Sequence, residues 1–183
     1  MTEPLWMPSL EHAQTTHMAR FIAEIGDRID AGVRNYETLY RYSVERPESF
    51  WNAIWDYGEV RADRRGEPVT ENWPAMPGTR WYPDARLNFA ANLLRRDDDS
   101  IAIEFAGEGG VRRSIRWSEL DREVARVAAG LRAQGIQPGD RVAGYLPNLP
   151  ETVIAMLAAS SIGAIWSSCS PDFVVRGVLD RFG

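Results

Sequence analysis

The stretch that most constrains the fold of this chain is 139–173, which reads GDRVAGYLPNLPETVIAMLAASSIGAIWSSCSPDF. The largely apolar run Arg141–Tyr145 predicts a strand. Pro150 then stands where a helix can begin, because proline needs no N–H at a first helical position. Apolar residues at helical spacing follow, and Gly163 is placed to end the helix. With a second strand expected over 164–167, the stretch is a βαβ unit, whose strands are parallel and whose crossover is right-handed.

A polar loop, 168–172, follows the second strand of this unit. In open parallel sheets, ligands bind beyond the carboxyl ends of the strands, and the loop lies at such an end. Ser170, Pro171 and Asp172 are therefore the candidate binding residues. An ordinary helix start explains them equally well, with Ser170 as N-cap, Pro171 in the first turn and Asp172 favoured by the helix dipole. The sequence leaves both interpretations open.

The residues between 100 and 139 predict further parts of an α/β fold. Apolar residues alternate with polar or small ones in 101–105 and 111–117, which predicts two strands joined as a hairpin. Ser118 is expected to cap a helix that ends at Gly135. Its buried stripe should consist of Leu120, Val124, Val127 and Leu131. A last helix is expected over 173–182.

The first hundred residues are predicted to be mainly helical. Residues 1–17 have no regular pattern and are expected to be irregular, whereas 18–30, 36–44 and 47–57 each predict a helix. The third helix carries an aromatic face that we expect to pack against another domain. Its members are Phe50, Trp51, Ile54 and Trp55. The stretch 58–78 is rich in glycine, proline and charge, which is typical of a connector, and 87–94 predicts a short amphipathic helix.

A family resemblance rests on the residues of the βαβ unit. GDRV, then PN-PE, then a helix of small residues ending in GA, resembles the beginning of the large domain of the adenylate-forming acyl-CoA ligases. The narrower motif SIGAIWSSCSPDF is similar to the members of that superfamily that act on acetoacetate. The similarity extends upstream through RYSVERPESFWNAIWDY and WYPDARLNFAANLL. One departure is Val174, at a position where those enzymes usually have a glycine, which would permit positive φ or a close approach to a ligand.

The resemblance implies both a fold and an activity. It implies a helical N-terminal extension over 1–99, followed over 100–183 by a β-hairpin and a parallel βαβ unit that open a truncated AMP-binding domain. The implied enzyme joins acetoacetate to coenzyme A through an acyl-adenylate, with ATP and Mg²⁺. In related ligases the loop equivalent to Ser170-Pro171-Asp172 lines the channel for the pantetheine arm of coenzyme A. An acetyl- or propionyl-type ligase and a non-catalytic truncated product or interaction module are the alternatives.

The residues needed for adenylation are not found in this sequence. All 21 basic residues are arginine, whereas acyl-adenylate formation needs a Ser/Thr/Gly-rich loop ending in lysine to offset the triphosphate charge. Paired carboxylates, a Ser/His/Asp set and metal-ligand spacings are also lacking, and His12 and His17 have no such partners nearby in sequence. We therefore assign no catalytic residue and no metal ligand. We expect an N-terminal fragment of a longer enzyme, with the catalytic sites beyond Gly183 and the fragment alone inactive.

Charge and composition limit the partners. The net charge of −5 gives no electrostatic reason to expect nucleic acid or an anionic membrane as a partner. Residues 1–4 lack the features of a signal peptide, and the longest apolar run is too short to span a bilayer. Cys169 is the single cysteine, so an intrachain disulfide is excluded, and we expect it to be a small packed residue rather than a catalytic thiol. A cytoplasmic protein acting on a small molecule is the default expectation.

Overall fold

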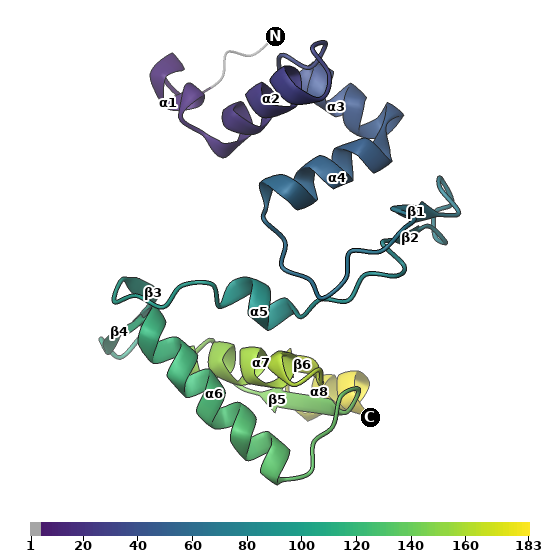
Figure 1. Cartoon of the computed structure of the whole chain (residues 1–183). Coiled ribbons are helices and arrows are strands. Elements are labelled where there is room, and N and C mark those ends of the chain that lie inside the picture. Colours follow the sequence, from purple (N-terminus) through teal and green to yellow (C-terminus); the bar gives the residue numbers. More distant parts are fainter. Residues whose placement is uncertain (1–4) are drawn as a thin grey trace. The chain divides into compact units, whose positions relative to one another are not determined.

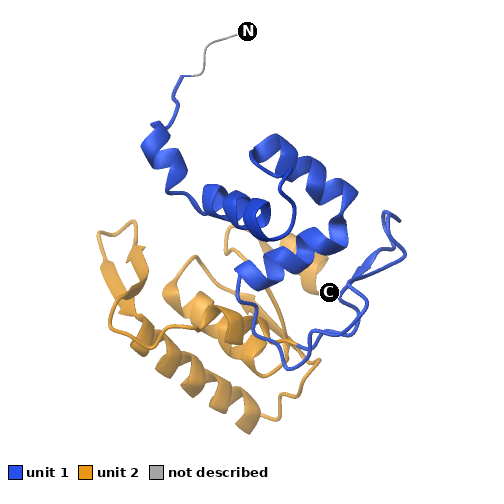
Figure 2. Cartoon of the chain, turned by 45° about the horizontal axis from the view of Figure 1, so that its top comes forward, with its two compact units in different colours: residues 1–86 blue, residues 87–183 orange. Residues whose placement is uncertain are grey.

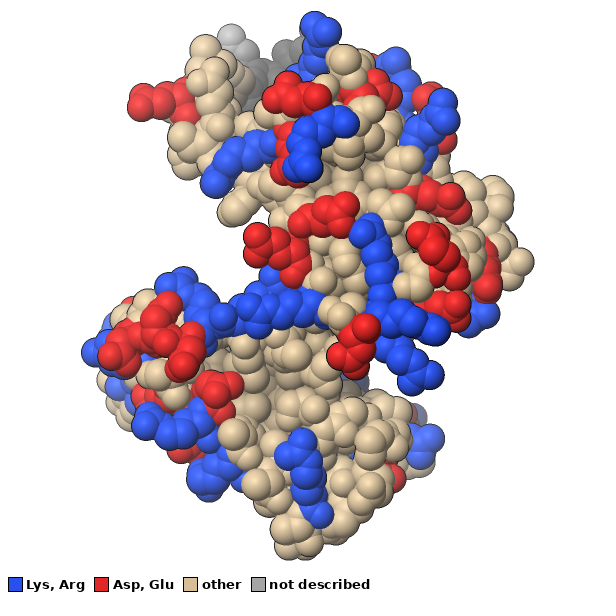
Figure 3. All heavy atoms as spheres, in the orientation of Figure 1, with Lys and Arg blue, Asp and Glu red and all other residues tan. Residues whose placement is uncertain are grey.

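The structure, a computed structural model, describes residues 5–183. Residues 1–4, where the sequence lacks the features of a signal peptide, lie outside the described residues. The chain divides into two compact units, Met1–Arg86 and Leu87–Gly183, which Figure 2 shows in different colours. Arginine and acidic side chains are interspersed over both units on the face drawn in Figure 3. No helix in the described part of the chain has the length and apolar character needed to cross a membrane.

The first unit begins with helices, which Figure 1 labels in chain order. They are α1 (Leu10–Gln14), α2 (His17–Arg28), α3 (Tyr36–Glu45) and α4 (Pro47–Tyr57). The three predicted helices are thus confirmed. The expectation of an irregular start was wrong for α1, because the Ser9 hydroxyl accepts a hydrogen bond from the His12 N–H at 3.1 Å and caps this short helix.

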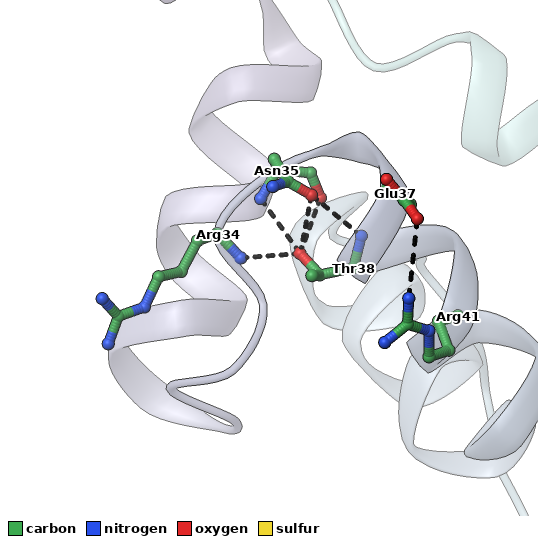
Figure 4. Close-up of polar contacts among 5 residues, drawn as sticks. All are labelled: Arg34, Asn35, Glu37, Thr38 and Arg41. Atoms are coloured by element: carbon green, nitrogen blue, oxygen red, sulfur yellow. Dashed lines mark hydrogen bonds and ion pairs between the residues drawn. The ribbon is translucent and has the colours of Figure 1, made fainter.

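A capping box fixes the start of α3, and Figure 4 shows its residues. The Asn35 side chain accepts from the Thr38 N–H at 2.9 Å, and the Thr38 hydroxyl accepts from the Asn35 N–H at 3.1 Å. The Thr38 hydroxyl also accepts from the Arg34 N–H at 2.9 Å. Threonine here takes the place usually held by glutamate or glutamine, and the exchange satisfies backbone donors that a helix start leaves unpaired.

The core of the first unit lies between α2, α3 and α4. Its buried residues are Phe21, Ile25, Val33, Leu39, Tyr42 and Ala53. Gly26 lets the chain after α2 return onto the helix, since a Cβ there would lie 2.6 Å from the Val33 carbonyl oxygen.

The connector that follows α4 is partly regular. It contains β1 (Thr70–Glu71), which pairs antiparallel with β2 (Arg80–Trp81). The aromatic face of α4 packs on this connector, with ring centroids 5.5 Å apart for Trp51 and Trp81 and 4.8 Å apart for Trp55 and Tyr82. The face that was expected to pack against another domain thus packs, through Trp51 and Trp55, on a later segment of the same unit.

Arg65 fastens the connector to α4. Its guanidinium lies 5.2 Å from the Trp55 ring and 5.9 Å from the Tyr82 ring. It also donates to Asp56 Oδ1 at 2.8 Å and to the Asn52 side chain. Burial raises the pKa of Tyr82, whose hydroxyl donates to the same Asn52 oxygen at 3.2 Å. One arginine thus serves as cation–π and hydrogen-bond partner at once, which its planar guanidinium permits.

The second unit opens with α5 (Phe89–Leu93) and the predicted hairpin, β3 (Ile101–Ala106) with β4 (Arg112–Arg116). The next helix, α6, spans Trp117–Ala133. Ser118 does not cap α6, because the helix begins one residue earlier and the Ser118 hydroxyl donates to Asp99 Oδ1 at 3.0 Å.

The predicted βαβ unit is confirmed. It consists of β5 (Arg141–Tyr145), α7 (Pro150–Ser161) and β6 (Ile165–Cys169), and the two strands are parallel. Gly163 follows α7 with φ of 79°, a conformation that glycine adopts without strain. The second strand runs to Cys169, beyond the predicted end at residue 167.

The core of the second unit lies around the contact between α6 and α7. Its buried members are Ala90, Ile115, Leu120, Val124, Ala128, Ile154, Leu157, Ala158, Ala159, Ile162 and Ala164. Of the predicted stripe on α6, Leu120 and Val124 are buried, and Val127 and Leu131 are partly buried. The Asn88 side chain donates to the Ser160 carbonyl at 2.9 Å, which ties the segment before α5 to the end of α7.

Candidate functional site

The candidate site is the loop 170–174, which begins where β6 ends. Tyr145 and Cys169, the last residues of β5 and β6, are paired in the parallel register, so the two carboxyl ends lie side by side. The Leu146 N–H donates to the Cys169 carbonyl at 3.2 Å, which continues the pairing to the edge of the sheet. Ser170, Pro171 and Asp172 therefore stand at the sheet edge where ligands bind in parallel α/β folds.

Hydrogen bonds within the loop shape it into a turn. The Ser170 hydroxyl donates to Asp172 Oδ2 at 2.7 Å and accepts from the Asp172 N–H at 3.3 Å. The Phe173 N–H donates to the Ser170 carbonyl at 3.0 Å. Ser170 is half-buried, and Pro171 and Asp172 are exposed. In this turn the Ser170 side chain is held by its hydrogen bonds to Asp172, while the Pro171 ring and the Asp172 carboxylate are exposed.

The structure does not support the helix-cap interpretation of these residues. The last helix, α8, spans Val175–Phe182, and its N-cap is Val174, which makes no side-chain capping bond. Ser170 is separated from the helix by the turn, and its hydroxyl donates a hydrogen bond to Asp172 instead. The predicted start at residue 173 is also two residues early.

Val174 does not need the backbone freedom of glycine. Its φ is −52° and its ψ is 170°, so φ is negative and the residue does not occupy the left-handed region that favours glycine. Its side chain is 72% exposed. The departure from the family pattern is therefore accommodated without backbone strain.

The hydroxyl of Tyr145 contacts the loop, a role that sequence reasoning missed. It donates to the Pro171 carbonyl at 2.8 Å and lies 3.4 Å from the Phe173 carbonyl. Arg181 of α8 lies over the Phe173 ring, with its guanidinium carbon 5.9 Å from the ring centroid. The one signal in the sequence is the place of Tyr145 at the end of the first parallel strand.

The residues beside the loop are packed rather than reactive. Cys169 is buried at 6% exposure, as expected for a small packed residue. Trp166 packs on the core of the unit, and its ring lies 2.7 Å from where a Cβ on Gly144 would be. These contacts fix the end of β6, where the loop begins.

A charged pair stands at the first turn of α7, the helix that follows β5. Arg113 of β4 donates to Glu151 Oε1 at 2.5 Å. This bond, and then the Glu151 N–H, hold the pKa of that carboxyl below its ordinary value. Both side chains are about half exposed, so solvent screens the pair.

The histidines lie in the first unit. His17 contacts Tyr57 through its Nδ1, 3.1 Å from the hydroxyl oxygen. His12 is exposed on α1. Across residues 5–183, no three His, Cys, Asp or Glu side chains are grouped closely enough to hold a metal ion.

Comparison with known proteins gives two family matches. Residues 89–179 match the model of the AMP-binding enzymes, and residues 36–93 match that of the acetyl-coenzyme A synthetase N-terminus.

Similar proteins match nearly the whole chain. An acetoacetyl-coenzyme A synthetase of Rhizobium meliloti is 46% identical over 98% of the chain and 28% of its own length. A malonamoyl-CoA synthetase of Penicillium aethiopicum is 39% identical over 98% of the chain and 25% of its own length. The solved acetoacetyl-CoA synthetase of Streptomyces lividans is 40% identical, with a TM-score of 0.91 over 99% of the chain and 28% of that protein.

The chain therefore spans little more than a quarter of the length of the relatives it matches. The predicted α/β fold, with a helical start, a hairpin and a parallel βαβ unit, is the fold of the corresponding part of the Streptomyces lividans structure. In sequence over residues 89–179 the chain matches the AMP-binding enzymes, and in sequence and fold over nearly its whole length it corresponds to the N-terminal part of the acetoacetyl-CoA synthetases.

Proposed function

We propose that this chain is the N-terminal part of a ligase that joins acetoacetate to coenzyme A in an ATP-dependent reaction. The observation that carries the proposal is the likeness to acetoacetyl-CoA synthetases over nearly the whole chain, in sequence and in fold. On this proposal, residues 1–99 are the helical extension of the enzyme and residues 100–183 begin its AMP-binding domain. Cytoplasmic localisation belongs to the same proposal.

The reaction divides the work between this chain and the rest of the ligase. Acetoacetate first displaces pyrophosphate from ATP to give an acyl-adenylate, and the thiol of coenzyme A then displaces AMP. The first step concentrates negative charge, and cations such as lysine and Mg²⁺ offset it. The 21 basic residues here are all arginine, so the lysine-dependent step belongs to residues outside this sequence.

The part proposed for this chain is one wall of the pantetheine passage. Ser170, Pro171 and Asp172 form an exposed turn at the carboxyl ends of two parallel strands. The pantetheine arm is long and uncharged, so a short, fixed, partly polar turn suits it better than a cluster of charges. No residue of this turn is assigned a chemical step.

The acid substrate is proposed to carry a carbonyl at its third carbon, so that the transferred group is a 3-oxoacyl group. Acetoacetyl and malonamoyl groups, named in two of the relatives, both carry a second carbonyl two carbons from the thioester carbon. Acetate and propionate lack that carbonyl. The rival short-chain ligase function therefore differs from the proposal by one hydrogen-bond acceptor on the substrate.

The test uses the complete ligase, meaning the protein in which this chain continues into a phosphate loop and a C-terminal domain. We expect kcat/KM to be highest for acetoacetate, lower for malonamate, and lowest for acetate and propionate. A preference for acetate in a side-by-side assay would reject the substrate proposal. If the gene encodes no phosphate loop after Gly183, the non-catalytic alternative is correct.

A further inference from the structure

We propose that Tyr145 is a positioning residue for the transfer of the acyl group to coenzyme A. Its hydroxyl holds the backbone of the turn 170–173 at a fixed place beside the end of β5. The inference rests on the proposed function, because it takes this turn as a wall of the pantetheine passage. The proposal does not require Tyr145 to contact the substrate.

The geometry shows a hydroxyl shared between two carbonyls. Tyr145 Oη lies 2.8 Å from the Pro171 oxygen and 3.4 Å from the Phe173 oxygen. These carbonyls belong to the residues before and after Asp172, so the hydroxyl contacts the backbone on both sides of that residue. The shorter contact is the main bond, since 2.8 Å is typical of a hydroxyl donating to an oxygen.

The bond from the Leu146 N–H to the Cys169 carbonyl fixes the residue before the turn, and residues 171–173 lie beyond that bond. The turn's own hydrogen bonds, between Ser170 and Asp172 and between Phe173 and Ser170, fix its shape but not its position relative to β5. Pro171 offers no N–H, and 171–174 are exposed. A segment with few buried contacts opens easily, so an anchor from a neighbouring strand decides how often it does.

Other contacts near the loop do not replace this anchor. Arg181 reaches the Ser168 carbonyl only at 3.5 Å, and Ser168 belongs to β6 rather than to the turn. Its guanidinium lies over the Phe173 ring at 5.9 Å, which holds a side chain but not the backbone around Asp172. Tyr145 joins the end of β5 to both carbonyls.

Packing of the ring does not explain why a tyrosine, with its hydroxyl, stands at position 145. The residue is 51% exposed, so its ring is not a core element. A phenylalanine would keep the same ring contacts. What the hydroxyl adds is the bond to the turn, and its loss should change the position of the turn more than the stability of the fold.

The test is Tyr145→Phe in the complete ligase. We expect the KM for coenzyme A to rise about fivefold, the change that follows from losing one hydrogen bond. The KM for ATP, the rate of acetoacetate-dependent pyrophosphate exchange and the melting temperature should stay unchanged. Hydrogen exchange at the amides of Asp172 and Phe173 should become faster. Tyr36→Phe is the control, since Tyr36 is 66% exposed on α3 in the other unit.

Two loop variants separate this inference from the proposed function. Ser170→Ala and Asp172→Ala test directly whether the turn belongs to the coenzyme A passage. If they raise the KM for coenzyme A and Tyr145→Phe does not, the positioning role is overturned and the loop assignment stands. If no variant changes that KM, both are overturned. A Tyr145→Phe protein with a lowered melting temperature and equal increases in all KM values would show a structural role only, against the inference.

Discussion

At the scale of single residues, two tyrosine hydroxyls of the first unit differ in one respect. Tyr57 donates to the His17 carbonyl at 3.2 Å, whereas the Tyr42 hydroxyl is buried without a hydrogen-bond partner among residues 5–183. Burying an unpaired hydroxyl costs free energy, because it loses water and gains nothing in return. The core around α3 therefore contains a polar atom that works against folding.

We predict that Tyr42→Phe stabilises the chain by about 1 kcal/mol, because it removes the unpaired hydroxyl and keeps the ring in the core. Urea unfolding of residues 1–183, followed by tryptophan fluorescence, measures the change in the free energy of unfolding. Tyr57→Phe is the matched control and should destabilise by roughly 0.5–1.5 kcal/mol, since it breaks a made bond. A destabilised Tyr42→Phe protein would show that its hydroxyl has a partner in solution.

The roles of residues whose type restricts or frees the backbone were predicted from the sequence. The hydrogen-bond partners of polar side chains were not, because each side chain has several possible partners. Proline fixes its own φ and glycine permits positive φ. The places of Pro150 and Gly163 at the two ends of α7 therefore follow from residue type. Ser118 and Ser170 are both suited to capping a helix, but each hydroxyl bonds to a nearby aspartate instead. Tyr145 could not be linked to 171–173 before the register of the parallel strands was known.

At the scale of elements, β4 and α7 are joined by the pair between Arg113 and Glu151. The pKa of Glu151 is lowered in the folded chain, so the pair contributes stability above the ordinary glutamate pKa of 4.5. That contribution is lost as the pH falls through the lowered pKa, because the protonated carboxyl no longer attracts the guanidinium. The half-exposed geometry limits it to about 0.5 kcal/mol at neutral pH.

We predict that Arg113→Gln lowers the free energy of unfolding by that amount at pH 7 and by much less at pH 3. The difference should also shrink in 1 M NaCl, which screens exposed pairs. Urea unfolding at the two pH values measures it, with Arg122→Gln, an exposed arginine on α6, as the control. An effect of Arg113→Gln that is equal at pH 7 and pH 3 would contradict the assignment of the Glu151 pKa to this bond.

Local signals predicted the long elements and the short helix α5, whereas the other short elements were not predicted. Both strands and the helix of the βαβ unit carry their own pattern, so Arg141–Tyr145 and the helix from Pro150 were placed correctly. The strands at 70–71 and 80–81 are two residues each and form on the aromatic face of α4, which no short pattern reveals. The same is true of α1, whose five residues depend on a single capping serine.

At the scale of the whole molecule, the chain holds two compact units and corresponds to about 28% of the length of its relatives. In the proposed division of labour, residues 1–99 extend the enzyme, and residues 100–183 bring the edge of a parallel sheet to the coenzyme A passage. On the proposed function, the lysine-dependent charge compensation of adenylation belongs to residues outside this sequence. The chain alone should therefore fail at the first chemical step, before coenzyme A is needed.

The most direct test is the acetoacetate-dependent exchange of labelled pyrophosphate into ATP, since this assay reports adenylation without coenzyme A. It is carried out on the purified chain of residues 1–183 and on the complete ligase at equal concentrations. We predict exchange by the complete ligase and only background exchange by the chain alone. Exchange above background by residues 1–183, dependent on acetoacetate, would contradict the account, because it would place an adenylation site in a chain without lysine.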